Sequence, residues 1–119
     1  MNRELEMAKL ACRALDEKKG KDIKVIDIHE VSVIADYFVI ASASNQNQVQ
    51  AMVDNVDETL GRAGFEAKQI EGTRNSSWVL MDYGDMIVHV FDEENRLFID
   101  LERIWRDGKV LDVNEFLEK

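Results

Sequence analysis

Apolar residues recur at helical spacing near the beginning of the chain. They occupy Leu5, Ala8, Ala11 or Cys12, and Leu15, which is the spacing of one face of an α-helix. The basic residues Lys18 and Lys19 before Gly20 are typical of a helix carboxyl end, where positive charge complements the helix dipole. The pattern predicts a first helix that ends close to Gly20.

A second amphipathic segment begins after Ser44 or Asn45, either of which can cap the start of a helix. Its apolar stripe consists of Val49, Met52, Val53, Val56 and Leu60. Gly64 can end this helix, and Phe65 just beyond it can pack back on the last turn. This segment is the clearest helix in the chain.

Five shorter apolar runs have the composition of β-strands. They lie at residues 23–28, 37–41, 66–70, 77–83 and 86–91. Helical spacing returns at residues 97–105, and residues 110–117 are assigned to a last short helical turn. The order of elements predicts an α/β fold with a mixed sheet of about five strands flanked by helices. No repeat or linker interrupts the chain, so we expect one domain over residues 1–119.

Gly84-Asp85 separates the last two strand-like runs, and a glycine-first pair is suited to a two-residue hairpin turn. With that turn, Tyr83 lies opposite Met86, and every further pair shares a face of the sheet. The first face, which we call the inner face, consists of Val79, Met81, Tyr83, Met86, Val88 and Val90. The second, the outer face, consists of Trp78, Leu80, Asp82, Ile87, His89 and Phe91.

The two faces of the predicted hairpin differ in composition. The inner face is almost wholly apolar, so we expect it to face the core. The outer face mixes large apolar groups with a carboxylate and an imidazole, and it carries a tryptophan, the residue most enriched at binding hot spots. We therefore take it as a candidate interface. The alternative is that a helix of the same chain covers it, with Asp82 and His89 as satisfied buried polar groups.

Charge narrows the class of partner. The formal net charge of −9 repels nucleic-acid phosphates and favours a basic partner such as a ribosomal protein, so we expect no direct nucleic-acid binding. No apolar run approaches the roughly 18 residues that a membrane span requires. The single cysteine, Cys12, cannot close an intramolecular disulfide, which suits a reducing compartment.

A phosphate-transferring enzyme would need a glycine-containing turn between strand and helix and paired carboxylates for a metal ion. Residues 41–44 read ASAS and lack that glycine, while Asp92 and Glu94 form only a common acidic triplet at a strand end. Asp27 and His29 share a strand face but do not make a metal site by themselves. Cys12 is expected in the core, away from a thiol-catalytic role. We expect no catalytic residues, no metal and no cofactor.

Six segments of the chain resemble, in order, the Iojap or ribosomal silencing factor family. They are DYFVI at 36–40, EG at 71–72, WVL at 78–80, DYGD at 82–85, VHVF at 88–91 and LERIW at 101–105. The resemblance covers about residues 22–107. Two positions depart from the family pattern: Ala43 stands where many members have glycine, and Ile99 stands where an aromatic residue is common, with Phe98 beside it.

The resemblance implies a translation repressor that binds the large ribosomal subunit on the fourteenth protein of its series. Bound there, such proteins block joining of the small subunit when nutrients fall. It also implies a nucleotidyltransferase-like fold without catalytic residues. The contact residues carried over by position are Trp78, Leu80, Asp82, Arg96 and Glu102. For Arg96, an ordinary ion pair with Asp92 or Asp100 remains an equal alternative.

Two other functions remain open from the sequence. One is a nucleotidyltransferase-like enzyme, which would bind nucleotide with magnesium. The other is a homodimerisation module that uses the outer face when the protein is free. No transit peptide precedes the first helix, so we expect a bacterial cytoplasmic location.

Overall fold

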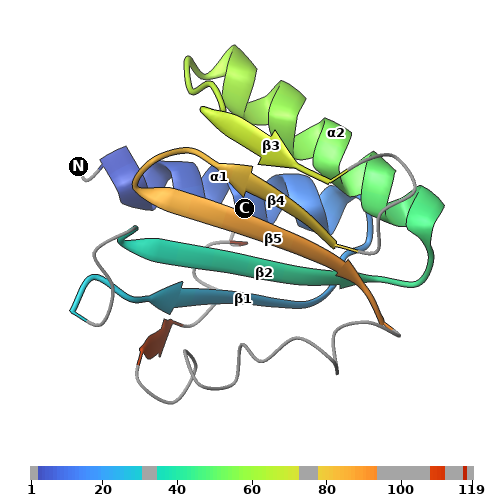
Figure 1. Cartoon of the computed structure of the whole chain (residues 1–119), viewed down its shortest axis with the longest axis horizontal. Helices are drawn as coiled ribbons and strands as arrows, with labels where there is room; N and C mark the ends of the chain where they lie inside the picture. The colour runs from blue at the N-terminus through green and yellow to red at the C-terminus, as the bar shows by residue number, and fades with distance from the viewer. Residues whose placement is uncertain (1–2, 31–34, 73–77, 94–107, 112–116, 118–119) are drawn as a thin grey trace.

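The structure, a computed structural model, describes residues 3–30, 35–72, 78–93, 108–111 and 117. Its elements in chain order are α1 (Arg3–Glu17), β1 (Lys21–Asp27), β2 (Tyr37–Ala43), α2 (Gln46–Arg62), β3 (Gln69–Glu71), β4 (Trp78–Asp82), β5 (Met86–Asp92) and β6 (Lys109–Leu111). The strands form one six-stranded sheet in the order β3-β4-β5-β2-β1-β6 (Figure 1). β2 and β5 pair in parallel, and the other neighbours are antiparallel. The predicted α/β class and mixed sheet are confirmed.

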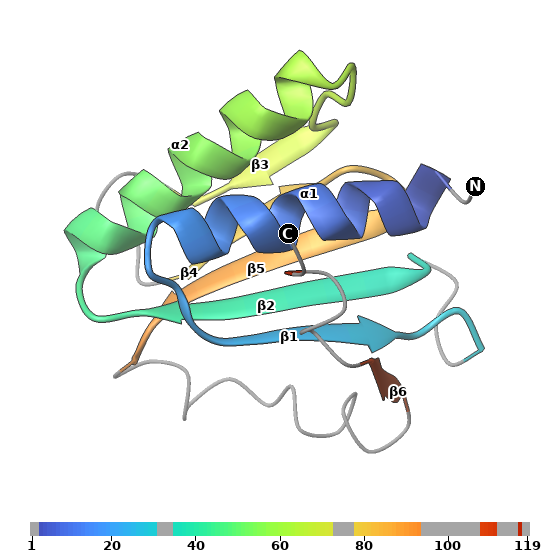
Figure 2. The same cartoon turned by 180° about the vertical axis from the view of Figure 1, so that it is seen from behind.

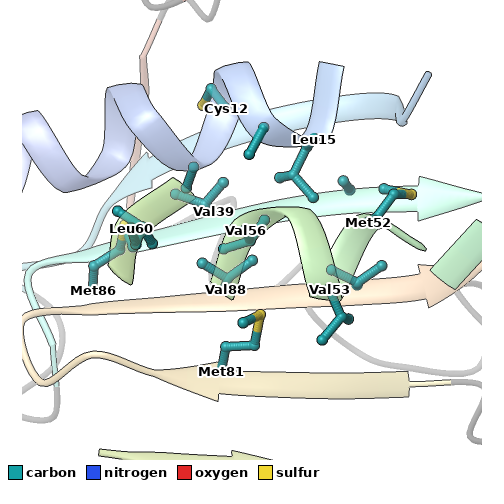
Figure 3. Close-up of a cluster of buried hydrophobic side chains, with 14 of the residues drawn as sticks. Cys12, Leu15, Val39, Met52, Val53, Val56, Leu60, Met81, Met86 and Val88 are labelled. Carbon is teal, nitrogen blue, oxygen red and sulfur yellow. The ribbon is translucent and has the colours of Figure 1, made fainter. Parts of the chain in front are cut away.

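Both described helices lie on the same face of the sheet, as the view from behind shows (Figure 2). Their apolar stripes meet the inner face of the hairpin and the neighbouring strand β2. Figure 3 shows this core, with Cys12 and Leu15 of α1 and four residues of α2 packed over the sheet residues Val39, Met81, Met86 and Val88. The helical spacing in the sequence therefore identified the buried face of each helix.

The ends of both helices follow the predicted capping chemistry. The Asn45 side chain accepts a hydrogen bond from the backbone N–H of Gln48, and the N–H of Phe65 donates to the carbonyl of Leu60 at 2.8 Å. At the end of α1, Lys19 takes the left-handed conformation with φ of 63°. A Cβ at Gly20 would lie only 3.0 Å from the backbone oxygen of Leu15, so this close turn favours glycine.

The sixth strand corrects one sequence expectation. Val110 and Leu111, assigned to a last helical turn, belong to β6, where they pair with Ile26 and Val25 of β1. The apolar pattern of so short a segment does not distinguish a helical turn from a strand, and the free edge of β1 supplies the hydrogen-bonding partners. The helix expected at residues 97–105 lies outside the described residues.

Candidate partner-binding surface on the hairpin

The hairpin of β4 and β5 has the turn that the sequence predicts. The N–H of Tyr83 donates to the carbonyl of Met86 at 2.9 Å, and Asp82 pairs with Ile87. Gly84 has φ of +91°, the left-handed region that glycine adopts without strain. The predicted register is confirmed, and with it the division into an inner and an outer face.

The inner face is core along its whole length, since each of its six residues is at most 6% exposed. The outer face is divided. Along β5, Ile87, His89 and Phe91 are buried, and they belong to or contact a second apolar cluster that includes Phe38 and Ile40 of the neighbouring strand β2. Along β4, Trp78 is 41% exposed, while Leu80 and Asp82 are half-buried. The candidate interface therefore narrows to the β4 side of the outer face.

Strand β3 adds two exposed polar side chains to the β4 side of the outer face. Gln69 pairs with Asp82 and Glu71 pairs with Leu80, so both point to the outer side of the sheet. Both are exposed, and Nε2 of Gln69 donates to Oε1 of Glu71 at 2.7 Å. We call Gln69, Glu71, Trp78, Leu80 and Asp82 the outer edge surface. Sequence reasoning missed Gln69 and Glu71 as site residues, although Glu71 stood in one of the matching segments.

The indole of Trp78 rests on an aromatic base. Its ring stacks on Phe91 with centroids 5.6 Å apart and on His89 with centroids 5.9 Å apart. His89 also meets the edge of Phe38 at 4.6 Å between centroids. One side of the indole is thus held by the protein, and the remaining 41% of the side chain is open to a partner.

Trp78 and His89 are also joined by a hydrogen bond. The indole Nε1–H donates to Nδ1 of His89 at 3.2 Å. Because an indole nitrogen only donates, Nδ1 must be unprotonated, and neutral His89 carries its proton on Nε2. In the described part of the chain, that buried Nε2 has no hydrogen-bond partner. Burial lowers the pKa of His89 to about 4, so the imidazole is neutral at pH 7.

The alternative from the sequence expected Asp82 and His89 to be buried polar groups with satisfied hydrogen bonds. Asp82 is only half-buried, and buried His89 has no partner for Nε2 among the described residues. Oδ1 of Asp82 accepts a hydrogen bond from the N–H of Gly84 at 2.7 Å, which braces the turn. An unpaired buried donor such as Nε2 of His89 costs about 1–3 kcal/mol, whereas a hydrogen bond contributes only about 0.5–1.5 kcal/mol net. His89 is therefore poorly explained by stability alone.

Five of the six segments that carry the family resemblance lie in or next to this hairpin, and the sixth, at 101–105, lies outside the described residues. The N–H groups of Asp36 and Tyr37 both donate to the carbonyl of Asp85, at 2.8 and 3.1 Å, which ties the start of β2 to the turn. Gly72 has φ of +113°, and a Cβ there would lie 2.8 Å from the carbonyl oxygen of Trp78. The spacing between these short segments thus has a physical basis in how the strands approach one another. Arg96 and Glu102 lie outside the described residues.

The structure does not support the metal-binding and thiol-catalytic sites that the sequence analysis considered. In the part of the chain that is described, no group of three or more histidine, cysteine, aspartate or glutamate side chains is placed to hold a metal ion. The Asp27 carboxylate instead hydrogen-bonds the ring and backbone of His29. Cys12 is buried, and its burial and the nearby Asp16 raise the pKa of the thiol to about 12. Such a thiol is not a nucleophile at neutral pH.

The start of α2, where a nucleotidyltransferase would cradle phosphate, is a hollow lined by Ser44, Asn45, Gln46, Asn47 and Asp92. Two of its backbone donors are already used: the N–H of Ser44 donates to Oε1 of Gln48, and the N–H of Gln48 donates to Asn45. These bonds cap the helix and reduce what remains for a phosphate. No described helix is long and apolar enough to cross a membrane.

Acidification is expected to destabilise the folded protein through His89. Burial lowers the pKa of folded His89 to about 4 from the ordinary histidine value of 6.5, so the unfolded chain takes up the proton first as pH falls. The stability that depends on neutral His89 is complete above about pH 6.5 and decreases by about 3 kcal/mol as pH falls to about 4. Urea titrations between pH 7 and pH 4 measure this loss, and His89→Phe should lack it.

His29 supplies the control for this pH dependence. The exposed His29 ring hydrogen-bonds to Asp27, which raises its pKa, so any stability that it contributes is present at low pH and is lost as pH rises through the raised value. His29→Gln should therefore retain the loss of stability between pH 6.5 and pH 4. An equal loss in wild-type protein and His89→Phe would show that His89 is not its source.

Comparison with known proteins identifies the family to which this chain is similar. A family model described as ribosomal silencing factor during starvation matches residues 1–119. A ribosomal silencing factor of Bacillus subtilis is 36% identical over 106 residues, which cover 89% of this chain and 90% of that protein. The chloroplastic protein Iojap of Zea mays is 27% identical over 92% of this chain and 47% of its own length.

The same fold is present among solved structures. A crystal structure of a protein from Chromobacterium violaceum superposes with a TM-score of 0.83 at 34% identity, over 88% of each chain. This match supports the mixed α/β sheet observed here. The likeness to nucleotidyltransferases stays a prediction.

Proposed function

This chain belongs to the ribosomal silencing factor family, a family whose action lies at the ribosome, and we propose that it represses translation by binding the large ribosomal subunit. In this proposal it binds the fourteenth protein of that subunit and sterically blocks joining of the small subunit when nutrients are limiting. The observation that carries the proposal is the half-exposed Trp78, held on an aromatic base at one end of the outer edge surface.

The chemistry of the outer edge surface fits a basic partner. Trp78 and Leu80 present apolar area that a partner pocket would desolvate, and such tryptophans commonly supply most of the binding energy. The carboxylates of Glu71 and Asp82 flank them and can accept hydrogen bonds from lysine or arginine. The net charge of −9 adds long-range attraction to a basic ribosomal protein. Arg96 and Glu102 are further proposed contacts, by resemblance alone.

In this proposal the protein acts by binding, as one domain over residues 1–119 in the bacterial cytoplasm, and uses no cofactor. The family description names a silencing role and no reaction. The capped start of α2 and the protonated thiol of Cys12 agree with that role. We do not assign catalytic residues.

Sedimentation tests the proposal directly. Purified protein should co-sediment with large ribosomal subunits from the organism that encodes it and not with small subunits. An excess of protein should reduce the fraction of joined ribosomes in a sucrose gradient. Equal joining with and without the protein would contradict the proposed function.

Homodimerisation through the same surface is the alternative occupant when the protein is free. The exposed Trp78 favours it, whereas two acidic surfaces facing each other repel. Mass measurement in solution, with and without the ribosomal partner, separates the two. A dimer that dissociates when the large subunit is added would indicate that both partners use the outer edge surface.

A further inference from the structure

His89 is an unusual residue for its position in the sheet. It is 4% exposed, lies between strands of apolar residues, and has no hydrogen-bond partner for its Nε2 among the residues that the structure describes. A phenylalanine of similar shape would fill the same space without an unpaired donor. A buried polar group that is only partly satisfied calls for an explanation other than packing.

Unlike phenylalanine, His89 supplies a hydrogen-bond acceptor at Nδ1. That acceptor is used by the indole N–H of Trp78, at 3.2 Å. The bond is part-buried, and Trp78 is 41% exposed, so solvent reaches part of this residue. The bond fixes the direction in which the indole N–H points, and with it the orientation of the ring.

We propose that His89 is a positioning residue, which locks the indole of Trp78 in the orientation that the partner receives; this rests on the proposed function of the outer edge surface. The imidazole is itself held, by Phe38 at its edge and by Phe91 in a nearly parallel stack at 6.0 Å. Its ring therefore cannot follow the indole if the indole turns. Hydrogen bond and stacking together restrain both side-chain torsions of Trp78 before binding.

The hydrogen bond between Trp78 and His89, which we call the lock, also indicates the chemistry of the partner's binding pocket. Since the single N–H of the indole already donates inside the protein, the partner does not have to supply an acceptor for it. The complementary site is therefore an apolar pocket that takes the open side of the ring. Its rim should carry lysine or arginine that faces Glu71, which pairs with Leu80 on the neighbouring strand, and Asp82, two residues further along β4.

Two substitutions separate positioning from simple structural support. His89→Phe keeps an aromatic ring against Phe91 and removes the acceptor, so we expect an unchanged or raised melting temperature and an affinity for purified large subunits that falls by about three- to tenfold. His89→Asn places its Oδ1 as many bonds from the backbone as Nδ1 of histidine. It should restore affinity to within about twofold of wild type, and its smaller side chain should lower the melting temperature.

The two properties should therefore rank the variants in opposite orders. If His89 only supports the fold, affinity will follow stability, with the phenylalanine variant binding best and the asparagine variant worst. That ranking, or equal affinity of His89→Phe and wild type, would overturn the proposal.

Nuclear magnetic resonance of the free protein tests the lock without the ribosome. The Trp78 indole N–H signal, assigned by its absence in Trp78→Phe, should exchange with water slowly in wild type and at least about tenfold faster in His89→Phe. Fast exchange in wild type would overturn the lock, even if His89→Asn does not fold. Slow exchange in a protein that does not bind large subunits would instead refute the proposed function and leave the lock standing.

Discussion

Replacement of Trp78 by alanine is expected to weaken binding to the large ribosomal subunit by at least about 30-fold. The open 41% of the side chain is the largest apolar group on the outer edge surface, and a partner pocket would remove it from water. The loss of free energy of unfolding should stay near 1–2 kcal/mol, because a part of the ring is already in solvent. Affinity and stability would then respond very differently to one substitution.

Ile70 supplies a matched control for Trp78. It is 43% exposed and lies in the neighbouring strand β3, but it pairs with Met81 and so points to the inner side of the sheet. Ile70→Ala should leave the affinity for large subunits within about twofold of wild type. Equal losses for Ile70→Ala and Trp78→Ala would mean that the partner does not select the outer side, and unfolding of Trp78→Ala would assign that residue to the core.

Met81→Ala is expected to lower the free energy of unfolding by about 2–5 kcal/mol. The Met81 side chain is fully buried in the core beneath Val53 and Val56 of α2, and truncation leaves a cavity between sheet and helix (Figure 3). Because Met81 faces away from the outer edge surface, the affinity of the remaining folded protein should not change. Urea titration gives the stability, and binding at a temperature where the variant is folded gives the affinity.

The adjacent residue, Leu80, should give the opposite result. Leu80 points to the outer face, where it is half-buried and pairs with His89. Leu80→Ala should therefore weaken binding by about fivefold or more while it destabilises the fold less than Met81→Ala does. A larger stability loss for Leu80→Ala than for Met81→Ala would contradict the division of the hairpin into an inner core face and an outer binding face.

The sequence predicted much of the local structure around the hairpin. Gly84-Asp85 determined the turn, the turn determined that Tyr83 lies opposite Met86, and the two-residue period of a strand assigned every side chain to a face. The stripes from Leu5 to Leu15 and from Val49 to Leu60 likewise identified the buried sides of α1 and α2. These features depend on neighbours within a few residues, which is why they can be inferred from spacing.

The extent of the site was decided by the tertiary structure. Trp78 and Phe91 are paired residues of one outer face, yet one is 41% exposed and the other is fully buried. Phe91 belongs to a buried cluster with Phe38 and Ile40 of β2, the strand beside β5, whereas β4 has only the three-residue β3 beyond it. Strand order depends on contacts between segments far apart in the chain, and periodicity carries no information about them.

The sequence by itself determined the amphipathic helices, the hairpin and the membership of its two faces, because each follows from the local geometry of the backbone. Only the tertiary structure decided that β6 pairs with β1, that the outer face is core along β5 and open along β4, and that the indole of Trp78 donates to His89. The hydrogen bond joins residues on two strands, and it depends on ring orientations that only the surrounding packing can set. The candidate interface is consequently smaller than the outer face that the spacing outlined, and Trp78, at one end of it, is its exposed large apolar residue.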